Sequence, residues 1–126
     1  MNRILLFLTL VAVFGVYSTS TAHMKPNLTS FYVAFKQGSK WDGSKLLKHQ
    51  AGMGDHIRFW KGLYHAGEIA AGGSFAGTGF GFYYLYAENQ KEAETKVGMD
   101  PLVKSGVLSF EIQKATITMK EKPHKH

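Results

Sequence analysis

The stretch Phe80–Ala87, FGFYYLYA, carries large side chains on both faces of one predicted strand. Successive side chains of a strand point to opposite faces. Phe82 and Tyr84 therefore share one face, and Tyr83 and Leu85 share the other. A strand with apolar residues on both faces needs cover on both, since soluble proteins rarely leave a large apolar patch in water. The stretch predicts a strand inside a sheet that one layer of helices alone does not enclose.

The segments on either side of this strand alternate between strand and helix patterns. The predicted strands are Phe31–Lys36, Glu68–Phe75, Phe80–Ala87 and Val107–Met119, and the predicted helices run over Asp55–Ala66 and from Asn89 to near Asp100. This order, β-α-β-β-α-β, predicts an α+β fold of the ferredoxin-like type, with an antiparallel sheet and helices on one face only. The pattern of Phe31–Lys36 is typical of a central strand.

For two of the predicted strands, the sequence pattern also predicts which side chains share a face. Strict alternation places Ile69, Ala71, Gly73 and Phe75 together on one face of the second strand. In the last strand the apolar phase inverts after Lys114. Such an inversion indicates either a bulge or a strand end that leaves its own sheet to pack elsewhere.

The predicted helix Asp55–Ala66 has one apolar, aromatic side and one cationic side. At 100° per residue its apolar arc consists of Ile57, Phe59, Trp60, Leu63 and Tyr64. Asp55 is the expected N-cap, and Gly67 stands where a C′ glycine belongs. In the following helix Asn89 is the expected N-cap, and Pro101 requires that helix to end near Asp100.

The first 22 residues have the organisation of a secretory signal peptide. Arg3 precedes the apolar run Ile4–Val16, and Ser20 and Ala22 supply small residues at the −3 and −1 positions of a cleavage site. The run is shorter than the roughly 20 residues that span a bilayer. We expect cleavage after Ala22 and a secreted or periplasmic protein without stable membrane insertion; an uncleaved anchor is the alternative.

Residues 23–126 then form one domain, with its core at about residues 30–119. The absence of cysteine excludes disulfides, a thiol nucleophile and cysteine-based metal sites. The formal net charge is +6, but lysines occur singly along the chain, and Arg58 is the only arginine after the signal peptide. Readers of phosphates and bases usually cluster Arg and Lys. Nucleic acid is therefore not an expected partner.

Three segments together resemble the YCII-related (YciI-like) family, over roughly Phe31 to Lys114. They are DHIRFWKGLYHAG at 55–67, EIAAGGSF at 68–75 and MDPLVKSGVL at 99–108. The second segment resembles a strand that ends in Gly-Pro-Phe, with Gly73-Ser74 standing where that motif has Gly-Pro. The third resembles an Asp-Pro-Phe-Val-Lys-x-Gly motif.

The resemblance implies a dimeric α/β barrel, in which the sheets of two chains close against each other. It also implies a site built on a recurring histidine and aspartate, which match His56 and Asp100, with a reaction that is generally unassigned. Closure of two sheets agrees with the doubly aromatic strand and with the phase inversion after Lys114. A homodimer is therefore the expected assembly.

His56 and Asp100 are the candidate catalytic residues. On the helical wheel His56 falls inside the apolar arc, near the start of the helix, where burial and the helix dipole disfavour its charged form. A neutral imidazole can accept a proton as a general base. Asp100 could orient that ring and fix its tautomer. The alternatives are a packed histidine satisfied by one hydrogen bond and an aspartate that only terminates a helix.

The predicted function is that of an enzyme acting on a small organic molecule in an aromatic pocket of the barrel. The residues expected to line this pocket are Trp60, Gly73, Ser74, Phe75 and Tyr84. Lyase, isomerase and hydrolase chemistry all stay open. The alternative is a non-catalytic dimeric module that binds a small molecule or acts in stress.

No metal or cofactor site is predicted. His56 and His65 are nine residues apart and point to opposite sides of one helix. His23 at the predicted mature N-terminus and the pair His124 and His126 could bind transition metals weakly, but each lacks a fixed third ligand. Asn27-Leu28-Thr29 is a glycosylation sequon that matters only in a eukaryotic secretory pathway.

Overall fold

The computed structural model describes residues 28–119 and has an α+β fold, as predicted. Its elements, in chain order, are β1 (Thr29–Gln37), the 3-10 helix η2 (Leu47–His49), α1 (Met53–His65), β2 (Ile69–Ser74), β3 (Gly81–Ala87), α2 (Gln90–Gly98), α3 (Pro101–Lys104) and β4 (Leu108–Lys114). The predicted signal peptide, Asn27 of the sequon and the histidines at 23, 124 and 126 lie outside the described residues.

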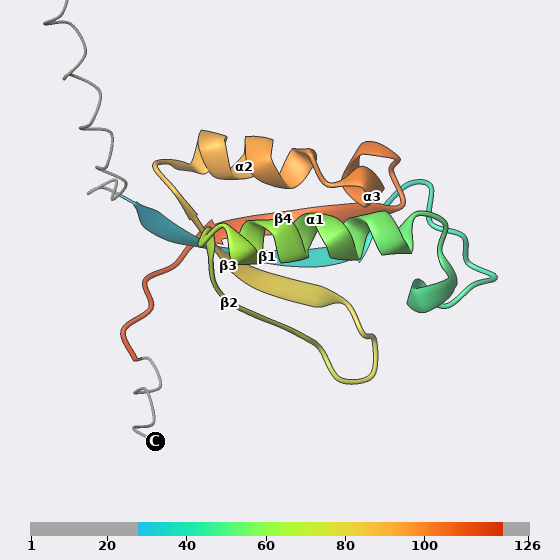
Figure 1. Cartoon of the computed structure of the whole chain (residues 1–126). Helices are drawn as coiled ribbons and strands as arrows, with labels where there is room; N and C mark the ends of the chain where they lie inside the picture. The colour runs from blue at the N-terminus through green and yellow to red at the C-terminus, as the bar shows by residue number, and fades with distance from the viewer. Residues whose placement is uncertain (1–27, 120–126) are drawn as a thin grey trace, which may run out of the picture.

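The four strands form one antiparallel sheet in the order β2-β3-β1-β4. β1 is central, as predicted, because it pairs with β3 on one side and with β4 on the other. α1 and α2 lie over one face of the sheet (Figure 1). This arrangement is compatible with a ferredoxin-like α+β fold.

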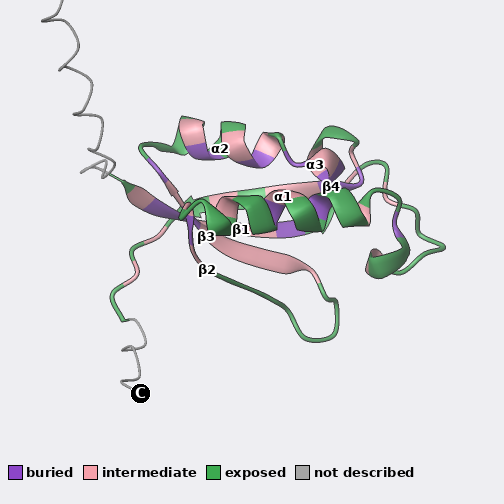
Figure 2. Ribbon diagram, viewed as in Figure 1, coloured by how far each residue is buried: buried purple, intermediate pink, exposed green. Residues whose placement is uncertain are grey.

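The core lies between the sheet and the helices. From the sheet it takes Phe31, Val33, Phe35, Leu85 and Leu108, and from the helices Trp60, Ala93, Val97 and Leu102, all buried. From Phe31 to Phe35 the buried residues of β1 alternate with half-buried ones, while Ser30, next to Phe31, is buried as well. Figure 2 shows buried segments on the strands and on the helix sides that face them. Burial of this apolar set holds α1, α2 and α3 against one face of the sheet.

The opposite face of the sheet carries aromatic side chains that contact one another. The ring centroids of Tyr32 and Tyr84, which are partners in the β1–β3 register, lie 5.4 Å apart. Phe82 lies 6.1 Å from Tyr32 and 5.0 Å from Phe75. We call Tyr32, Phe75, Phe82 and Tyr84 the open-face aromatic cluster. The alternation predicted for Phe80–Ala87 is confirmed for Phe82 and Tyr84 against Tyr83 and Leu85.

The prediction for the second strand is wrong, because β2 contains an irregularity between Ile69 and Ala71. Ile69 is opposite Leu85, on the helix side, whereas Ala71 is opposite Tyr84, on the open side. One extra residue in a strand reverses the facing of all that follow. Gly73 therefore does not share a face with Ile69.

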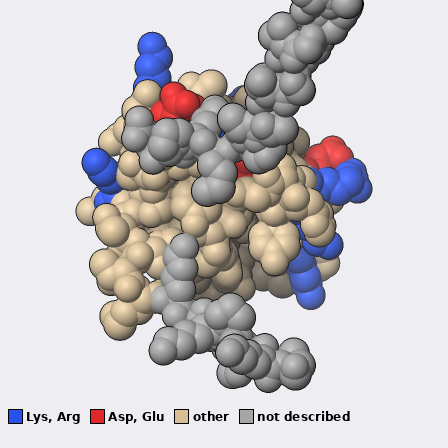
Figure 3. All heavy atoms as spheres, turned by 60° about the vertical axis from the view of Figure 1, so that its left-hand side comes forward, with Lys and Arg blue, Asp and Glu red and all other residues tan. Residues whose placement is uncertain are grey.

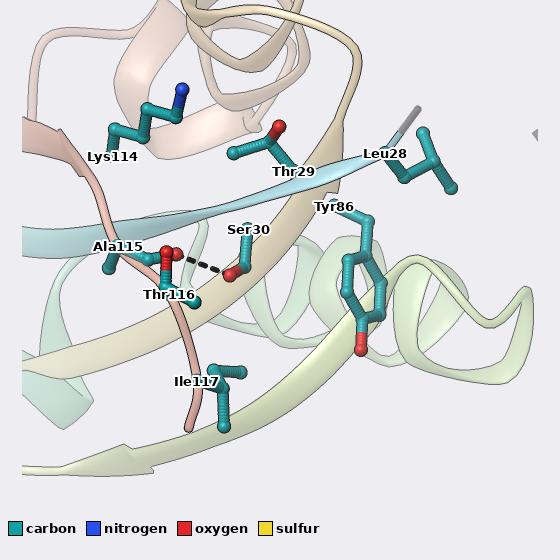
Figure 4. A pocket seen from close by; sticks show the side chains of 8 residues that line it. All are labelled: Leu28, Thr29, Ser30, Tyr86, Lys114, Ala115, Thr116 and Ile117. Atoms are coloured by element: carbon teal, nitrogen blue, oxygen red, sulfur yellow. Dashed lines mark hydrogen bonds between the residues drawn. The ribbon is translucent and has the colours of Figure 1, made fainter. Parts of the chain in front are cut away.

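The last strand is shorter than predicted, since β4 ends at Lys114 and residues 115–119 leave the sheet. The Ala115 N–H donates to the Ser30 carbonyl at 3.0 Å, and the Ser30 hydroxyl donates to the Ala115 carbonyl. In Figure 4 Ser30, Tyr86 and Ile117 point to the side of the sheet away from Lys114. The sequence left two explanations for the phase inversion, a bulge or a strand end that leaves the sheet. In the structure, the strand end leaves the sheet.

Of the two ends predicted for the first long helix, the C-terminal one is confirmed and the N-terminal one is wrong. α1 begins at Met53 with Gly52 as its N-cap, so Asp55 is in the first turn and is not the cap. Gly67 has φ 78° and donates to the Tyr64 carbonyl, while Glu68 donates to the Leu63 carbonyl. These two bonds form a Schellman motif, which confirms the predicted C′ glycine.

α2 is capped as predicted, because the Asn89 side chain accepts from the Glu92 N–H at 2.8 Å. The structure adds two short elements that the sequence patterns did not predict, η2 and α3. On the side of the molecule seen in Figure 3, charged side chains lie mainly around the edge and uncharged ones fill the middle. No single basic patch dominates that view.

Candidate functional site

Asp100 is a buried carboxylate at the junction of α2 and α3. It follows α2 by two residues and is the N-cap of α3, where its Oδ1 accepts from the Leu102 N–H at 2.9 Å. Pro101 occupies the first position of α3, where a missing N–H costs nothing. The side chain is 0% exposed. Oδ1 thus caps α3, and Oδ2 faces the core.

The second oxygen of Asp100 joins α3 to α1. Oδ2 lies 2.6 Å from Nδ1 of His56 and accepts from the indole N–H of Trp60 at 2.7 Å. His56 and Trp60 are one helical turn apart on α1, so both reach the same carboxylate. We call these three side chains the Asp100 triad. The helical wheel placed His56 correctly, since it is 5% exposed and faces the core.

Aromatic rings enclose the triad on the sheet side. The Phe35 ring meets His56 edge-on at 5.3 Å and Trp60 at 5.5 Å. Tyr83 stacks flat on Trp60, with ring centroids 4.2 Å apart and planes 4° from parallel. The rings fix the orientation of both α1 side chains and keep water away from Asp100, which strengthens the hydrogen bonds to its carboxylate.

The second ring nitrogen of His56, Nε2, has no hydrogen-bond partner among residues 28–119. No fully buried side-chain nitrogen or oxygen in this part of the chain lacks a partner. Nε2 must therefore reach the molecular surface. It is the one polar atom of the triad that is open to a ligand.

The environment of the triad also acts on the phenol of Tyr83. Desolvation by burial raises the pKa of Tyr83 above its ordinary value of 10.0, and the nearby negative charge of Asp100 raises it further. A buried phenolate would lie close to a buried carboxylate, so both effects favour the protonated phenol. Tyr83 is therefore a hydrogen-bond donor across the neutral pH range.

A groove of about 420 Å³ runs beside the triad, between α1 and the edge strand β2. It is lined by Ile57, Trp60, Lys61, Tyr64, Ile69, Gly72, Gly73, Ser74 and Tyr83. Trp60 belongs to both the triad and the groove wall, whereas His56 and Asp100 do not line the groove. We call this cavity the α1–β2 groove.

The structure brings together some of the predicted pocket residues and separates others. Trp60, Gly73 and Ser74 all line the α1–β2 groove. Phe75 lines a different cavity of about 520 Å³, beside Leu47 and Met53. Tyr84 lies on the open face of the sheet, in contact with Tyr32.

Six groove residues were not among the candidates: Ile57, Lys61, Tyr64, Ile69, Gly72 and Tyr83. For two of them, Tyr83 and Gly72, the reason lies in the strand pattern. Tyr83 could have been found from the strand period, because it stands opposite in phase to Tyr84 and so faces the helices. Gly72 became a helix-side position only through the irregularity at Ala70, which alternation alone does not reveal.

Two further observations concern metals and membranes. Residues 28–119 contain no group of three or more His, Asp or Glu side chains placed to hold a metal ion. Within the same range, no helix has the length and apolar character needed to cross a bilayer.

Comparison with known proteins gives no family for this chain. The sequence matches no protein-family model, and no curated protein matches it. Function is therefore inferred from the triad, the groove and the sequence resemblance.

Proposed function

We propose that this chain is an exported, YciI-like enzyme that removes a proton from a small organic molecule, with His56 as general base. The observation that carries the proposal is the contact of 2.6 Å between His56 Nδ1 and Asp100 Oδ2 in a buried site. A carboxylate only accepts, so it holds the His56 proton on Nδ1. The lone pair of Nε2 then stays available for a proton from the ligand.

Proton transfer to Nε2 gives an imidazolium beside the Asp100 carboxylate. Opposite charge at this distance stabilises the imidazolium, as the aspartate does in other histidine dyads. The electron pair left on the ligand needs a carbonyl or a leaving group to receive it. Elimination, isomerisation and attack by an activated water all satisfy this requirement. The proposal therefore names the class of reactions that begin with proton removal by a base, and not one reaction within it.

Trp60 has a positioning role in this proposal. Its indole N–H is a donor only, so it shares Asp100 Oδ2 with His56 without competing for the proton. Leu102 N–H holds the other oxygen. Asp100 is therefore fixed by backbone and side-chain donors before it acts on His56, which is the preorganisation that proton transfer needs.

The proposed assembly is a homodimer that closes the open face of the sheet. The open-face aromatic cluster and the departing segment 115–119, with the half-buried Ile117, support it. Dimers of this kind bury roughly 2,000 Å² or more. Sedimentation equilibrium of residues 23–126 at micromolar concentration should give the mass of two chains; the mass of one chain would refute the closure.

Deuterium exchange tests the catalytic role even while the product is unidentified. A panel of small 2-oxo acids, lactones and unsaturated acids is incubated in D₂O with the wild-type protein, and NMR follows the loss of C–H signals and the appearance of products. For any substrate found, His56→Gln should lower the rate by about 10²–10⁴-fold, the usual range for a general base. Asp100→Asn should lower it at least tenfold.

His65→Gln is the matched control, because His65 is an exposed histidine on the same helix. Its rate should stay within twofold of wild type. Equal rates for wild type and His56→Gln would remove the dyad from the mechanism. Binding of panel members without exchange or turnover would favour the alternative, a non-catalytic small-molecule module.

A further inference from the structure

The α1–β2 groove has walls that suit a flat apolar group. Trp60 and Tyr83 form a stacked pair on its inner side. On its outer side, Ile57 and Tyr64 of α1 are 44% and 63% exposed, so apolar surface faces the open space. At about 420 Å³ the groove falls within the range of small-ligand sites.

The β2 side of the groove is kept open by its glycines. A Cβ atom on Gly72 would lie 2.5 Å from Cδ1 of Tyr83 and 3.2 Å from the Phe82 carbonyl oxygen. A side chain there would push Tyr83 off Trp60 or out into the groove. The width of the groove and the stacking of Tyr83 on Trp60 thus both depend on glycine at position 72.

None of the polar side chains that line the groove is acidic, and each can donate a hydrogen bond. Lys61 supplies an ammonium group, Ser74 and Tyr83 supply hydroxyls, and the Tyr64 hydroxyl belongs to the outer wall. Within residues 28–119 the side chains of Lys61, Ser74 and Tyr83 make no ion pair or hydrogen bond. The raised pKa of Tyr83 keeps its hydroxyl protonated. Three unpaired donors beside an apolar wall fit an anion with several acceptor oxygens.

We infer that the α1–β2 groove binds a small carboxylate with a flat, unsaturated or aromatic body. The body stacks between the apolar wall of α1 and the glycine backbone of β2, and the carboxylate faces Lys61, Ser74 and Tyr83. The groove contains Trp60, whose indole N–H contacts Asp100, so a bound ligand touches the side chain that positions the triad. The binding itself is argued from the groove lining, and only the assignment of the bound carboxylate as the enzyme's substrate rests on the proposed function.

The test uses a pair of probes of nearly the same shape, one anionic and one neutral. 2-Naphthoate is the flat carboxylate, and naphthalene-2-carboxamide is its neutral analogue of the same shape. Each is titrated into ¹⁵N-labelled protein covering residues 23–126 at low salt. The backbone amides of Gly72 and Gly73 report on the groove, and that of Gly43, an exposed loop residue that does not line it, is the internal control.

Naphthoate should shift the Gly72 and Gly73 signals and leave Gly43 in place, with an affinity at least tenfold higher than that of the amide. Lys61→Gln should abolish this preference, whereas Lys91→Gln, which removes an exposed lysine from α2, should preserve it. Tyr83→Phe, which keeps the ring and removes the hydroxyl, should weaken naphthoate binding by about three- to tenfold. Gly72→Ala should weaken both probes.

Two results would overturn the inference: equal affinity for the two probes, or no shift of the groove glycines at millimolar naphthoate. If Gly72→Ala proves unfolded by circular dichroism, the Lys61→Gln and Lys91→Gln comparison still decides, because both substitutions are on exposed side chains.

The experiment separates this inference from the proposed function. His56→Gln should bind naphthoate within twofold of wild type, since His56 does not line the groove. Carboxylate-selective binding without turnover of any panel compound would support the groove assignment and contradict the enzyme. Turnover that depends on His56, combined with no naphthoate binding, would support the enzyme and overturn the groove assignment.

Discussion

On the helix-covered face of the sheet, Phe35 and Tyr83 pack around a buried carboxylate whose two oxygens are both hydrogen-bonded. On the opposite face, Tyr32, Phe82 and Tyr84 contact mainly one another. Both sets come from the same two strands and differ only in the parity of their positions. Folding of one chain thus satisfies both oxygens of Asp100 on the covered face, whereas the open face still has apolar surface to bury.

The largest expected effect comes from removing the acceptor on the covered face. Asp100→Ala leaves the donors of Trp60 and Leu102 without their partner and opens a cavity in the core. Each buried donor left without an acceptor costs about 1–3 kcal/mol, so the loss of both contacts should lower the free energy of unfolding by about 2–6 kcal/mol. Urea unfolding followed by circular dichroism measures this free energy.

The control for this substitution is Asp42→Ala, at an exposed aspartate that accepts from Ser44. It should cost far less than Asp100→Ala, because the exposed Asp42 carboxylate is solvated and its partners can bond to water instead. A similar free energy of unfolding for Asp100→Ala and Asp42→Ala would show that the triad is not the anchor of the covered face.

The open face is tested through the segment that leaves the sheet. Truncation after Lys114 removes Ala115 and Ile117, which we expect to contact the partner chain. It should raise the dimer dissociation constant at least tenfold, which corresponds to about 1.4 kcal/mol. Sedimentation equilibrium measures the constant, and far-UV circular dichroism checks the monomer fold.

Truncation after Met119 is the matched control, because it removes only residues 120–126. That protein should dimerise as the full mature chain does. If both truncated proteins keep wild-type dimerisation, the segment 115–119 does not cross to a partner.

The fold was largely predictable, because most of it follows from the spacing of apolar residues and from the residue types that begin and end helices. Alternation identified β1 and β3, and Asn89 and Gly67 marked helix ends by local hydrogen bonds that depend on residue type. The irregularity in β2 was not predictable, since Ala70, Ala71 and Gly72 have no apolar contrast that would reveal a change of phase. The helix α3 has only four residues, so it is too short to show a helical period in the sequence. Its start is fixed by Asp100, which acts as its N-cap.

The candidate site was predictable in its composition but not in its geometry. The helical wheel placed His56 in the core, and the resemblance paired it with Asp100. Neither could show that Trp60 donates to the same oxygen or that Tyr83 stacks on Trp60. These contacts depend on how α1 packs against β3, which is a tertiary property.

On the covered face, a smaller effect than that of Asp100→Ala is expected from Trp60→Phe, which keeps an aromatic ring in the core and removes the donor to Asp100. A hydrogen bond to a charged group contributes about 1.5–3 kcal/mol. We expect a loss within that range in urea unfolding. Trp41→Phe, at a half-buried tryptophan that packs against Phe80, should cost less. The reverse order would mean that the indole N–H adds little to the network.

The smallest effect concerns Lys96, at the edge of the covered face. Desolvation lowers the pKa of Lys96, but hydrogen bonds and ion pairs with Glu68 and Glu92 outweigh it, so the pKa lies above the ordinary value of 10.5. This stabilisation is present below pH 10.5 and is lost as the pH rises through the raised pKa. Partial exposure limits it to about 1 kcal/mol or less.

Urea unfolding at pH 8 and pH 11 measures this contribution. Wild type should lose more stability between the two pH values than Lys96→Met does. An equal loss in both proteins would show that the Lys96 ion pairs contribute nothing measurable.

The tautomer of His56 tests the central claim most directly, because the proposed chemistry requires the proton on Nδ1 and a free lone pair on Nε2. Long-range ¹H–¹⁵N NMR of histidine-labelled protein at pH 8.5, where an ordinary histidine is neutral, distinguishes the two ring nitrogens. We predict a protonated Nδ1 and an unprotonated Nε2 for His56, and loss of this preference in Asp100→Asn. Wild-type His56 with its proton on Nε2, or the same tautomer in both proteins, would contradict the account.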